Sequence, residues 1–264
     1  CGLQDVFAEG RGRDLPIAGV LGSIDEKIEL NRKKIAELEA LAKTIYDYWF
    51  VQFDFPDANG KPYKSSGGKM VWNEQLKREV PAGWETCTIG QLCTCHDSKR
   101  IPLSGKQRVE MQGDIPYYGA TGVMDHVNKY IFDGEYLLFA EDGSVMTEEG
   151  FPILQIISGK TWVNNHAHVL SPRANCSVKF LQLHFRNIPV RKIKTGSIQP
   201  KITKDNLFSF RVLSIPHAIL TMADKIFDAV QKDIETEEQA VVSMTHQRDL
   251  LLPLLMNGQV EVAG

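Results

Sequence analysis

The chain has 264 residues, of which 43% are hydrophobic and 24% are charged, so we expect a folded protein with one large domain or a domain plus an extension. No apolar run reaches the ~18 residues that a membrane-spanning helix needs, and the polar opening segment lacks the pattern of a signal peptide. The five cysteines include no spaced CxxC pairs, which predicts a reduced, cytoplasmic protein with no membrane partner.

The net charge of −3 taken alone argues against a nucleic-acid partner, but the charges are unevenly distributed. The segment Leu220–Leu255 holds seven acids and three bases, whereas Arg186–Lys204 holds six bases and no acid. Because local charge determines binding to a polyanion, the net charge does not exclude nucleic acid.

The first predicted element is a long helix that begins at Pro16. Residues 1–15 indicate no clear element, and because the chain opens on Cys1 we expect a remnant of a preceding domain or a tail. Apolar residues then recur at alternating spacings of four and three, which is typical of a narrow coiled-coil stripe that needs a partner helix. The stripe consists of Ile17, Leu21, Ile24, Ile28, Asn31, Ile35, Leu38, Ala42, Ile45 and Trp49. A capping box at 23–26 would allow the regular helix to begin only at Ile24.

Six aromatic residues crowd the end of this helix, namely Tyr46, Tyr48, Trp49, Phe50, Phe53 and Phe55. Such a cluster can stack on bases, but it more commonly forms a hydrophobic dock, and we predict that it fixes the following domain to the helix end. Pro56–Glu79 contains turn signals and a Ser-Ser-Gly-Gly run, which predicts a linker.

Val80-Pro-Ala-Gly-Trp84 opens a middle domain in which short alternating or apolar runs predict strands. These runs are Thr86–Leu92, Val127–Phe132, Tyr136–Ala140, Pro152–Ile157, Trp162–Val163, Ala167–Leu170 and Phe208–Ile215. Val178–Phe185 predicts a short helix.

A second long helix is predicted from Pro216 to Met256, before the stop signal Asn257-Gly258. Its stripe has the same spacing and consists of Leu220, Ala223, Phe227, Val230, Ile234, Glu237, Val241, Met244, Arg248, Leu251 and Leu255. The fold class is therefore α+β, a strand-rich mixed α/β domain plus two long helices that form an antiparallel coiled coil. The predicted bounds are 1–15 for the remnant or tail, 16–53 for the first helix, 54–79 for the linker, 80–215 for the domain, 216–257 for the second helix and 258–264 for the C-terminal tail.

Two groups of metal-ligand residue types attract attention, and neither is complete. Cys87, Cys93, Cys95 and His96 lie close together, but the second ligand pair of a zinc site is missing. His166 and His168 form an HxH pattern with no evident third ligand. We predict no metal.

No phosphate loop, dinucleotide fingerprint, methyl-donor motif or nucleophile elbow occurs in the sequence. Glu141 and Asp142 are adjacent carboxylates in a loop, which predicts a solvated turn rather than a nuclease centre. We therefore expect no catalytic residues, no cofactor and no enzyme.

Basic loops mixed with polar side chains remain as candidates for binding DNA. Lys and Arg suit phosphates or guanine, and Asn and Gln suit adenine. Asn164, Asn165 and His166 suit either a bound ligand or backbone groups at a strand start, and both interpretations stay open. The candidate DNA-binding residues are Lys99, Arg100, Lys106, Arg108, Tyr118, Thr121, Asn164, Asn165, His166, Lys194, Ser197, Gln199 and Lys201.

Six motifs occur together over nearly the whole chain: Leu21-Gly-Ser-Ile-Asp-Glu-Lys-Ile28, Val80-Pro-Ala-Gly-Trp84, Ile115-Pro-Tyr-Tyr-Gly119, Asn164-Asn-His-Ala-His168, Gly196-Ser-Ile-Gln-Pro200 and Arg248-Asp-Leu-Leu-Leu-Pro253. In combination they resemble the DNA-specificity subunit of type I restriction–modification systems. The resemblance implies a target recognition domain held by an antiparallel pair of conserved helices.

The resemblance also implies recognition without chemistry. The domain would dock in the major groove of double-stranded DNA, with phosphates held by Lys99, Arg100, Lys106, Lys194 and Lys201. The helices would bind a methyltransferase (modification) subunit and, through it, a restriction subunit. A complete family member has two recognition domains and this chain has one, so we expect a half-subunit or a fragment. A half-subunit could form a homodimer through its helices and read a symmetric site.

Two other functions remain open from the sequence. One is a coiled-coil interaction or scaffold protein that does not bind DNA. The other is a DNA-binding module with its own nuclease activity.

Overall fold

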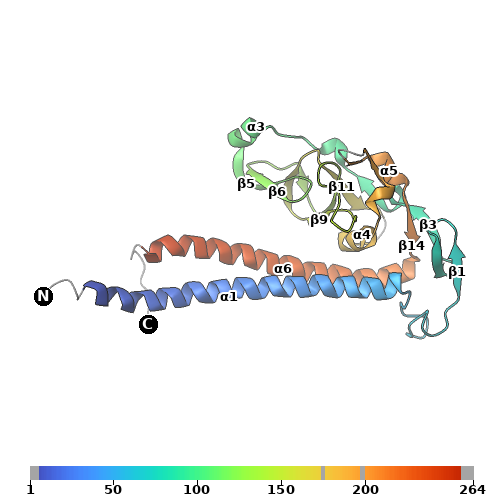
Figure 1. Ribbon diagram of the computed structural model, residues 1–264, viewed down its shortest axis with the longest axis horizontal. Coiled ribbons are helices and arrows are strands. Elements are labelled where there is room, and N and C mark those ends of the chain that lie inside the picture. The colour runs from blue at the N-terminus through green and yellow to red at the C-terminus, as the bar shows by residue number, and fades with distance from the viewer. Residues whose placement is uncertain (1–5, 174–175, 197–199, 257–264) are drawn as a thin grey trace. The chain divides into compact units, whose positions relative to one another are not determined.

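The computed structural model describes residues 6–173, 176–196 and 200–256, with the backbone alone for residues 6–18 and 256 (Figure 1). By its internal packing the chain divides into two units. The helical unit comprises Cys1–Thr44 and Ala229–Gly264, and the globular unit comprises Ile45–Asp228. Strands and long helices are both present, and the predicted α+β class is confirmed.

The helical unit is built from the two long helices, α1 (Val6–Tyr46) and α6 (His217–Met256). Two ion pairs join them, Lys34 with Glu237 and Arg248 with Asp25, the latter at 3.0 Å between Nη1 and Oδ1. A step toward the C-terminus on one helix corresponds to a step toward the N-terminus on the other, so the helices are antiparallel, as predicted.

The heptad stripe predicted from the sequence is the less exposed side of both helices. Within the helical unit Ile28 and Ala42 of α1, and Val230 and Ile234 of α6, are at most 7% exposed. Asn31 is only half-buried and lines a hollow with Lys34 and Glu237. Apolar burial along the stripe stabilises the pair, while this polar layer favours one register over others.

The start of α1 differs from the prediction. The helix begins at Val6, ten residues before Pro16, so the expectation of no clear element was wrong for residues 6–15. The Ala, Glu and Arg residues of this segment are good helix formers. Ser23 is not an N-cap, because its hydroxyl donates a hydrogen bond to the carbonyl of Val20 at 2.8 Å, as a serine inside a helix does.

The globular unit contains two four-stranded sheets. In the first the strand order is β6-β5-β10-β7, and in the second it is β4-β11-β8-β9. All pairs are antiparallel except β5 with β10. The strands of the first sheet are β5 (Gln112–Tyr118), β6 (Val123–Val127), β7 (Phe132–Asp133) and β10 (Lys160–Val163). Those of the second are β4 (Cys93–Cys95), β8 (Tyr136–Ala140), β9 (Leu154–Ile157) and β11 (Ala167–Pro172).

Among its described residues the globular unit also contains three two-stranded pairs and several short helices. The pairs are β1 (Met70–Asn73) with β2 (Arg78–Pro81), β3 (Glu85–Thr88) with β14 (Arg211–Ser214), and β12 (Lys194–Thr195) with β13 (Lys201–Ile202). The helices are η1 (Asp47–Val51), α2 (Ile89–Leu92), η2 (Asp97–Lys99), α3 (Gly105–Glu110), α4 (Val178–Phe185), η3 (Val190–Lys192) and α5 (Lys204–Ser209). One core cluster contains Phe132, Leu138, Ile157, Val163, Ala167 and Val169.

The aromatic dock is confirmed within the globular unit. The Tyr46 ring lies 5.2 Å from Phe50 and 6.4 Å from both Phe180 and Phe227, between ring centroids. The Tyr46 hydroxyl is 2.8 Å from Nδ1 of His184. Burial lowers the pKa of His184 to about 4, so its ring is neutral near pH 7 and can accept this hydrogen bond.

Several strand predictions were confirmed, including Tyr136–Ala140 as β8 and the helix Val178–Phe185 as α4. The second half of Thr86–Leu92 was wrong, because a capping box between Thr88 and Gln91 turns Ile89–Leu92 into the helix α2.

Two other elements were also misplaced. The run Phe208–Ile215 contributes only 211–214 to β14, since a helix capped by Thr203 extends to Ser209. Val127–Phe132 is split between β6 and β7. Asn128 donates its backbone N–H to the carbonyl of Met111, which continues the pairing with the β5 segment by one residue beyond Val127.

The predicted linker Pro56–Glu79 is only partly irregular. Asp57 forms the expected turn, with its carboxylate accepting backbone N–H groups from Asn59 and Lys61. Farther on, Val71 and Trp72 favour extended structure and form β1 of a hairpin.

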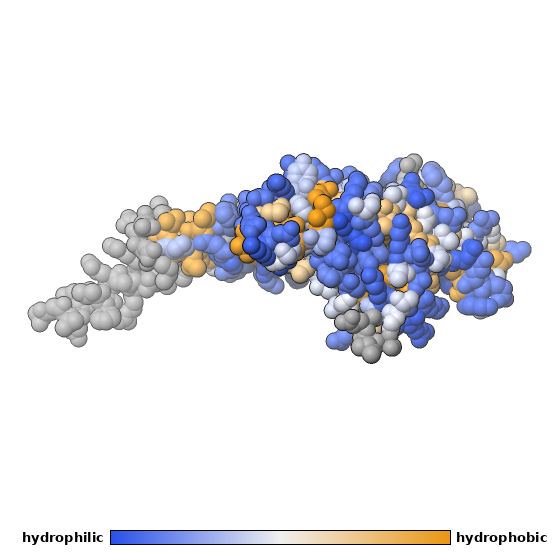
Figure 2. Space-filling view, turned by 90° about the horizontal axis from the view of Figure 1, so that it is seen from above, coloured by the Kyte–Doolittle hydropathy of each residue, from blue (hydrophilic) through white to orange (hydrophobic). Residues whose placement is uncertain are grey.

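Figure 2 shows that hydrophilic residues cover most of the face in view, with hydrophobic residues in small separate groups.

Replacing Ile234 by Ala should lower the free energy of unfolding by about 2–4 kcal/mol, because removal of a buried side chain of the heptad stripe would leave a cavity between the helices. The matched control is Val242→Ala on the same helix, where the side chain is 69% exposed and the change should stay within about 0.5 kcal/mol. Urea unfolding followed by circular dichroism measures both effects. Equal effects of the two changes would contradict the assignment of the heptad stripe as the helix contact.

Candidate nucleic-acid interface

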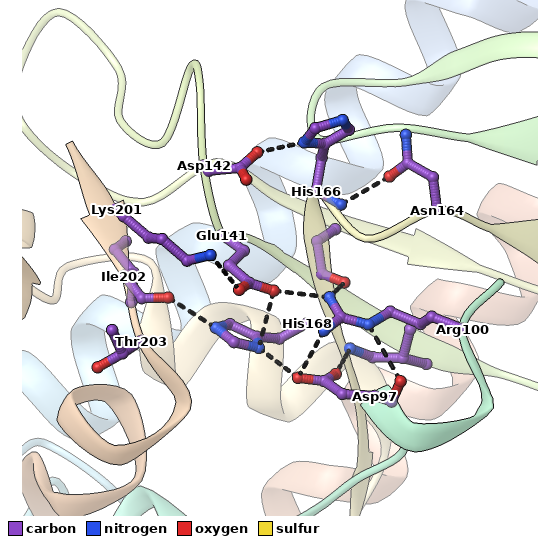
Figure 3. A network of polar contacts seen from close by, with 12 residues as sticks. Asp97, Arg100, Glu141, Asp142, Asn164, His166, His168, Lys201, Ile202 and Thr203 are labelled. Atoms are coloured by element: carbon purple, nitrogen blue, oxygen red, sulfur yellow. Dashed lines mark hydrogen bonds and ion pairs between the residues drawn. The ribbon is translucent and has the colours of Figure 1, made fainter. Parts of the chain in front are cut away.

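Five charged side chains from four segments of the globular unit meet in one network, which we call the ionic cluster (Figure 3). Its members are Asp97, Arg100, Glu141, His168 and Lys201. The pairing of β8 with β11 sets Ala140 opposite Ala167, and therefore brings the residue after β8 beside the start of β11.

Arg100 is fixed inside the cluster and not directed to solvent. Its Nη1 donates to Oε2 of Glu141 at 2.7 Å and to the carbonyl oxygen of Ala167 at 2.6 Å, and its Nη2 lies 3.2 Å from Oδ2 of Asp97. The Arg100 side chain is only 12% exposed. A buried cation with this many acceptors is held tightly, because losing any partner would leave a charge without compensation.

His168 occupies the centre of the cluster, and its side chain is 1% exposed. Its Nδ1 lies 2.6 Å from Oδ2 of Asp97, and its Nε2 lies 2.8 Å from the carbonyl oxygen of Ile202. Carboxylate and carbonyl oxygens only accept hydrogen bonds, so both ring nitrogens must donate and the ring is a cation.

The electrostatics agree with this geometry. Burial by itself lowers the pKa of His168, but the hydrogen bonds with Asp97 and Cys95 and the charge of Asp97 outweigh it and raise that pKa to about 9. For Asp97 burial acts to raise the pKa, yet the His168 and Val169 hydrogen bonds and the Arg100 charge lower it below the usual value.

Glu141 and Asp142 were predicted to form a solvated turn, and for Glu141 this was wrong. The Glu141 side chain is 11% exposed and pairs with both Arg100 and Lys201, the latter at 3.1 Å. The cause is backbone pairing that continues past β8. The Glu141 N–H donates to the carbonyl of His166, and the Glu141 carbonyl accepts from the N–H of Ile202, both at 2.8 Å.

Cys95, Asp97 and His168 place their ligand atoms within 4.8 Å of one another. The cationic His168 ring and the Arg100 guanidinium already balance the charge of the Asp97 carboxylate. A metal ion would have to take the place of the ring proton and of the guanidinium. His166 and His168 also do not face a common point, because His166 pairs with Asp142 while His168 lies in the cluster (Figure 3). The geometry therefore favours an ionic cluster over a metal site.

Some of the residues predicted to bind DNA are already engaged within the domain. Besides Arg100, Arg108 donates from Nε to Asp125 at 2.9 Å and from Nη1 to the Leu103 carbonyl at 3.0 Å. Asn164 is 3% exposed, and its Oδ1 accepts the His166 N–H at 2.8 Å. His166 itself is exposed but pairs with Asp142. The Asn164 side chain thus satisfies a backbone group at the start of the strand.

Other predicted residues are accessible. Lys99, Lys106, Thr121 and Asn165 are exposed, and Tyr118 and Lys194 are half-buried. Lys201 is 48% exposed and shares Glu141 with Arg100. Ser197 and Gln199 lie outside the described residues.

The structure therefore brings some predicted residues together and separates others. Lys99 ends η2, two residues after Asp97 of the cluster, and Lys201 begins β13 at the opposite side of it. Lys194 reaches the same place through the pair β12–β13, in which it lies opposite Ile202. Lys106 and Thr121 belong to a different region, around α3 and the turn between β5 and β6.

Comparison with known proteins shows the family of this chain. The family model of the type I restriction modification DNA specificity domain matches residues 81–242, more than half of the chain. The chain belongs to this family.

Two curated members of the family match the chain. A protein from Haemophilus influenzae that carries the name of a type I restriction enzyme specificity subunit is 34% identical over 157 residues, which is 60% of this chain and 39% of that protein. The type I restriction enzyme MjaIX specificity subunit of Methanocaldococcus jannaschii is 22% identical over 270 residues, covering 93% of this chain and 58% of that protein. The chain thus spans about two fifths to three fifths of the length of these specificity subunits.

A solved structure of the type I restriction–modification S subunit from M. genitalium has the same fold. The TM-score is 0.61 at 18% identity, over 92% of this chain and 60% of that chain. None of the described helices of this specificity-domain chain is long and apolar enough to cross a membrane.

The raised pKa of His168 predicts how the stability of the globular unit depends on pH. Because the folded pKa of about 9 exceeds the ordinary histidine pKa of 6.5, the stabilisation is complete below pH ~6.5 and is lost as the pH rises toward 9. The loss should be of the order of 3 kcal/mol or less. Urea unfolding at pH 6.5, 8 and 9.5 measures it. In His168→Gln this slope should disappear, and an unchanged slope would show that another group titrates.

Proposed function

We propose that the chain recognises a specific sequence in double-stranded DNA as the DNA-reading part of a type I restriction–modification complex. The family match over residues 81–242 is the observation that carries this proposal, because it covers the globular unit from β2 onward and much of α6. The chain would supply recognition, while a methyltransferase subunit and, through it, a restriction subunit supply the chemistry.

Free cations on the surface of the globular unit support a DNA-binding role. Lys99, Lys106 and Lys194 form no ion pair with any residue in the described parts of the chain, and Lys201 is half exposed. Cations that the fold has not neutralised can replace the counterions of the DNA backbone. We assign phosphate contacts to these four lysines, and a supporting role to Arg100 and Arg108, which already bind acceptors of the domain.

Base contacts are proposed at the turn between β5 and β6 and beside it. Thr121 is exposed in that turn, and the next two exposed side chains, Val123 and Met124, are apolar. A hydroxyl can bond a base edge, and apolar side chains can contact the methyl group of thymine. Asn165, the residue before His166, is also exposed. It remains a candidate for a base contact, together with Tyr118, Ser197 and Gln199.

We also propose that the chain performs no reaction itself. In the ionic cluster the carboxylates of Asp97 and Glu141 are bound by Arg100, His168 and Lys201, so they are not available to hold a catalytic metal ion. The two helices of the helical unit would bind the methyltransferase subunit. If the chain acts as a half-subunit, two copies would read a symmetric site.

Methylation mapping of host DNA tests the proposal. In cells with the complete system, one defined sequence motif should be methylated, and deletion of this chain should remove that methylation while the methyltransferase subunit is still present. A palindromic motif would support two copies of the same reader, and an asymmetric motif would contradict the homodimer. Methylation that persists after deletion would contradict the proposed function and favour a scaffold role.

Binding of a duplex that contains the mapped motif should weaken steeply with salt. Lys194→Ala and Lys201→Ala should each lower the magnitude of the slope of log affinity against log salt by about 1, because one phosphate contact is lost. Lys33→Ala, on the helical unit, is the control and should leave the slope unchanged. Fluorescence anisotropy between 50 and 250 mM salt measures it, at roughly the range in which counterion release is resolved. Unchanged slopes in the first two variants would place the phosphate contacts elsewhere.

A further inference from the structure

We infer that His168 is a positioning residue for DNA binding, because it holds the Lys99 segment and the Lys201 segment at a fixed separation while both of its ring nitrogens are protonated. The inference rests on the proposed function and adds to it a residue that does not touch DNA. It also adds a condition, the loss of a ring proton from His168, under which the separation of the surface lysines changes.

The geometry shows His168 as a clamp between three parts of the chain. The residue belongs to β11, its Nδ1 binds Asp97 at the start of η2, and its Nε2 binds the backbone of Ile202 in β13. Asp97 and Ile202 are separated by more than a hundred residues in sequence. Lys99 follows the first by two positions, and Lys201 precedes the second by one.

The clamp works only with a cationic ring. If the ring lost one proton, one nitrogen would become an acceptor and would face another acceptor at hydrogen-bonding distance. The charged contact with Asp97 is the stronger of the two. The contact with the Ile202 carbonyl would therefore be lost. β13 would keep two contacts with Glu141, the N–H of Ile202 on its carbonyl and the Lys201 ion pair with its carboxylate.

The groups that face His168 from each neighbouring element all favour or permit the cation. From η2 comes the Asp97 carboxylate, and from the segment after β8 comes Glu141, with Oε2 3.7 Å from Nδ1. Cys95 of β4 also forms a hydrogen bond with the ring. Two cations of the cluster, Arg100 and Lys201, reach it only through these carboxylates.

Loss of this anchor would act on DNA binding through geometry. Phosphates along a duplex strand have a fixed spacing, so lysines on two segments contribute together only when the separation of the segments matches it. A β13 strand without its contact to His168 is held less firmly, so Lys201, and with it Lys194 on the paired strand β12, would move relative to Lys99. Affinity for the target should then fall while the chain stays folded.

The test combines the protonation state of His168 with the affinity for DNA. Histidine-labelled full-length chain is studied by nitrogen-15 NMR, and one of the seven histidines should keep both ring nitrogens protonated at pH 8. That signal should be absent in His168→Gln. Binding of a fluorescent duplex with the mapped motif is measured from pH 6.5 to 9.5 at constant ionic strength.

In the wild-type chain the affinity should fall by about tenfold as the pH passes through about 9. His168→Gln should bind about tenfold more weakly at pH 7 and show no such step. Asp97→Asn should move the step to lower pH, because the carboxylate that favours the cation is gone, whereas a merely structural defect would lower affinity equally at every pH. His96→Gln is the matched control, since burial and the Lys99 charge lower the pKa of His96, and it should keep the wild-type step.

Equal affinities and equal pH profiles of the wild-type chain and a folded His168→Gln would overturn the inference and leave the proposed function intact. If His168→Gln does not fold, an unshifted step in Asp97→Asn would overturn it. A wild-type chain that binds the mapped duplex no better than an unrelated duplex would instead contradict the proposed function, whatever the NMR signal of His168 shows.

Discussion

In the antiparallel register of β8 and β11, Ala140 lies opposite Ala167, and the arrangement of the candidate interface follows from this pairing. It sets Glu141 beside the start of β11, and the same backbone then receives Ile202 of β13. Because side chains on both faces of these strands are mostly buried, a shift by one residue would exchange the side chains of two packed faces. The packing of an apolar sheet thus fixes the positions of the charged side chains in the ionic cluster.

The two long helices could be predicted well because their information is periodic and local. A stripe repeated over many turns survives single exceptions such as Asn31 and Glu237, and the structure turns both of these into one polar layer. Their ends were less predictable. Ser23 has the residue type of a cap, yet it lies inside α1 and bonds backward to Val20. Short segments such as Ile89–Leu92 fit a strand or a helix equally well, and the capping contact decides.

The candidate surface was only partly predictable, and the reason is distance along the chain. Residue type identifies Arg100, Arg108 and Asn164 as suitable for DNA, but only the fold shows which acceptors they meet. Asp97 and His168, 71 positions apart, carry no mutual signal in the sequence. The HxH pattern lies at the start of β11, but its spacing did not indicate that Asp142 pairs with one histidine and the ionic cluster with the other.

The aromatic dock has a consequence for dissection of the protein. Tyr46 and Phe50, from the end of α1 and the turn after it, share ring contacts with Phe180 of the domain, and Phe227 of α6 joins them. An excised fragment limited to 80–215 would lose three of these four rings and expose Phe180 to water. The smallest autonomous piece must therefore keep short stubs of both long helices, even though neither stub carries a residue assigned to DNA.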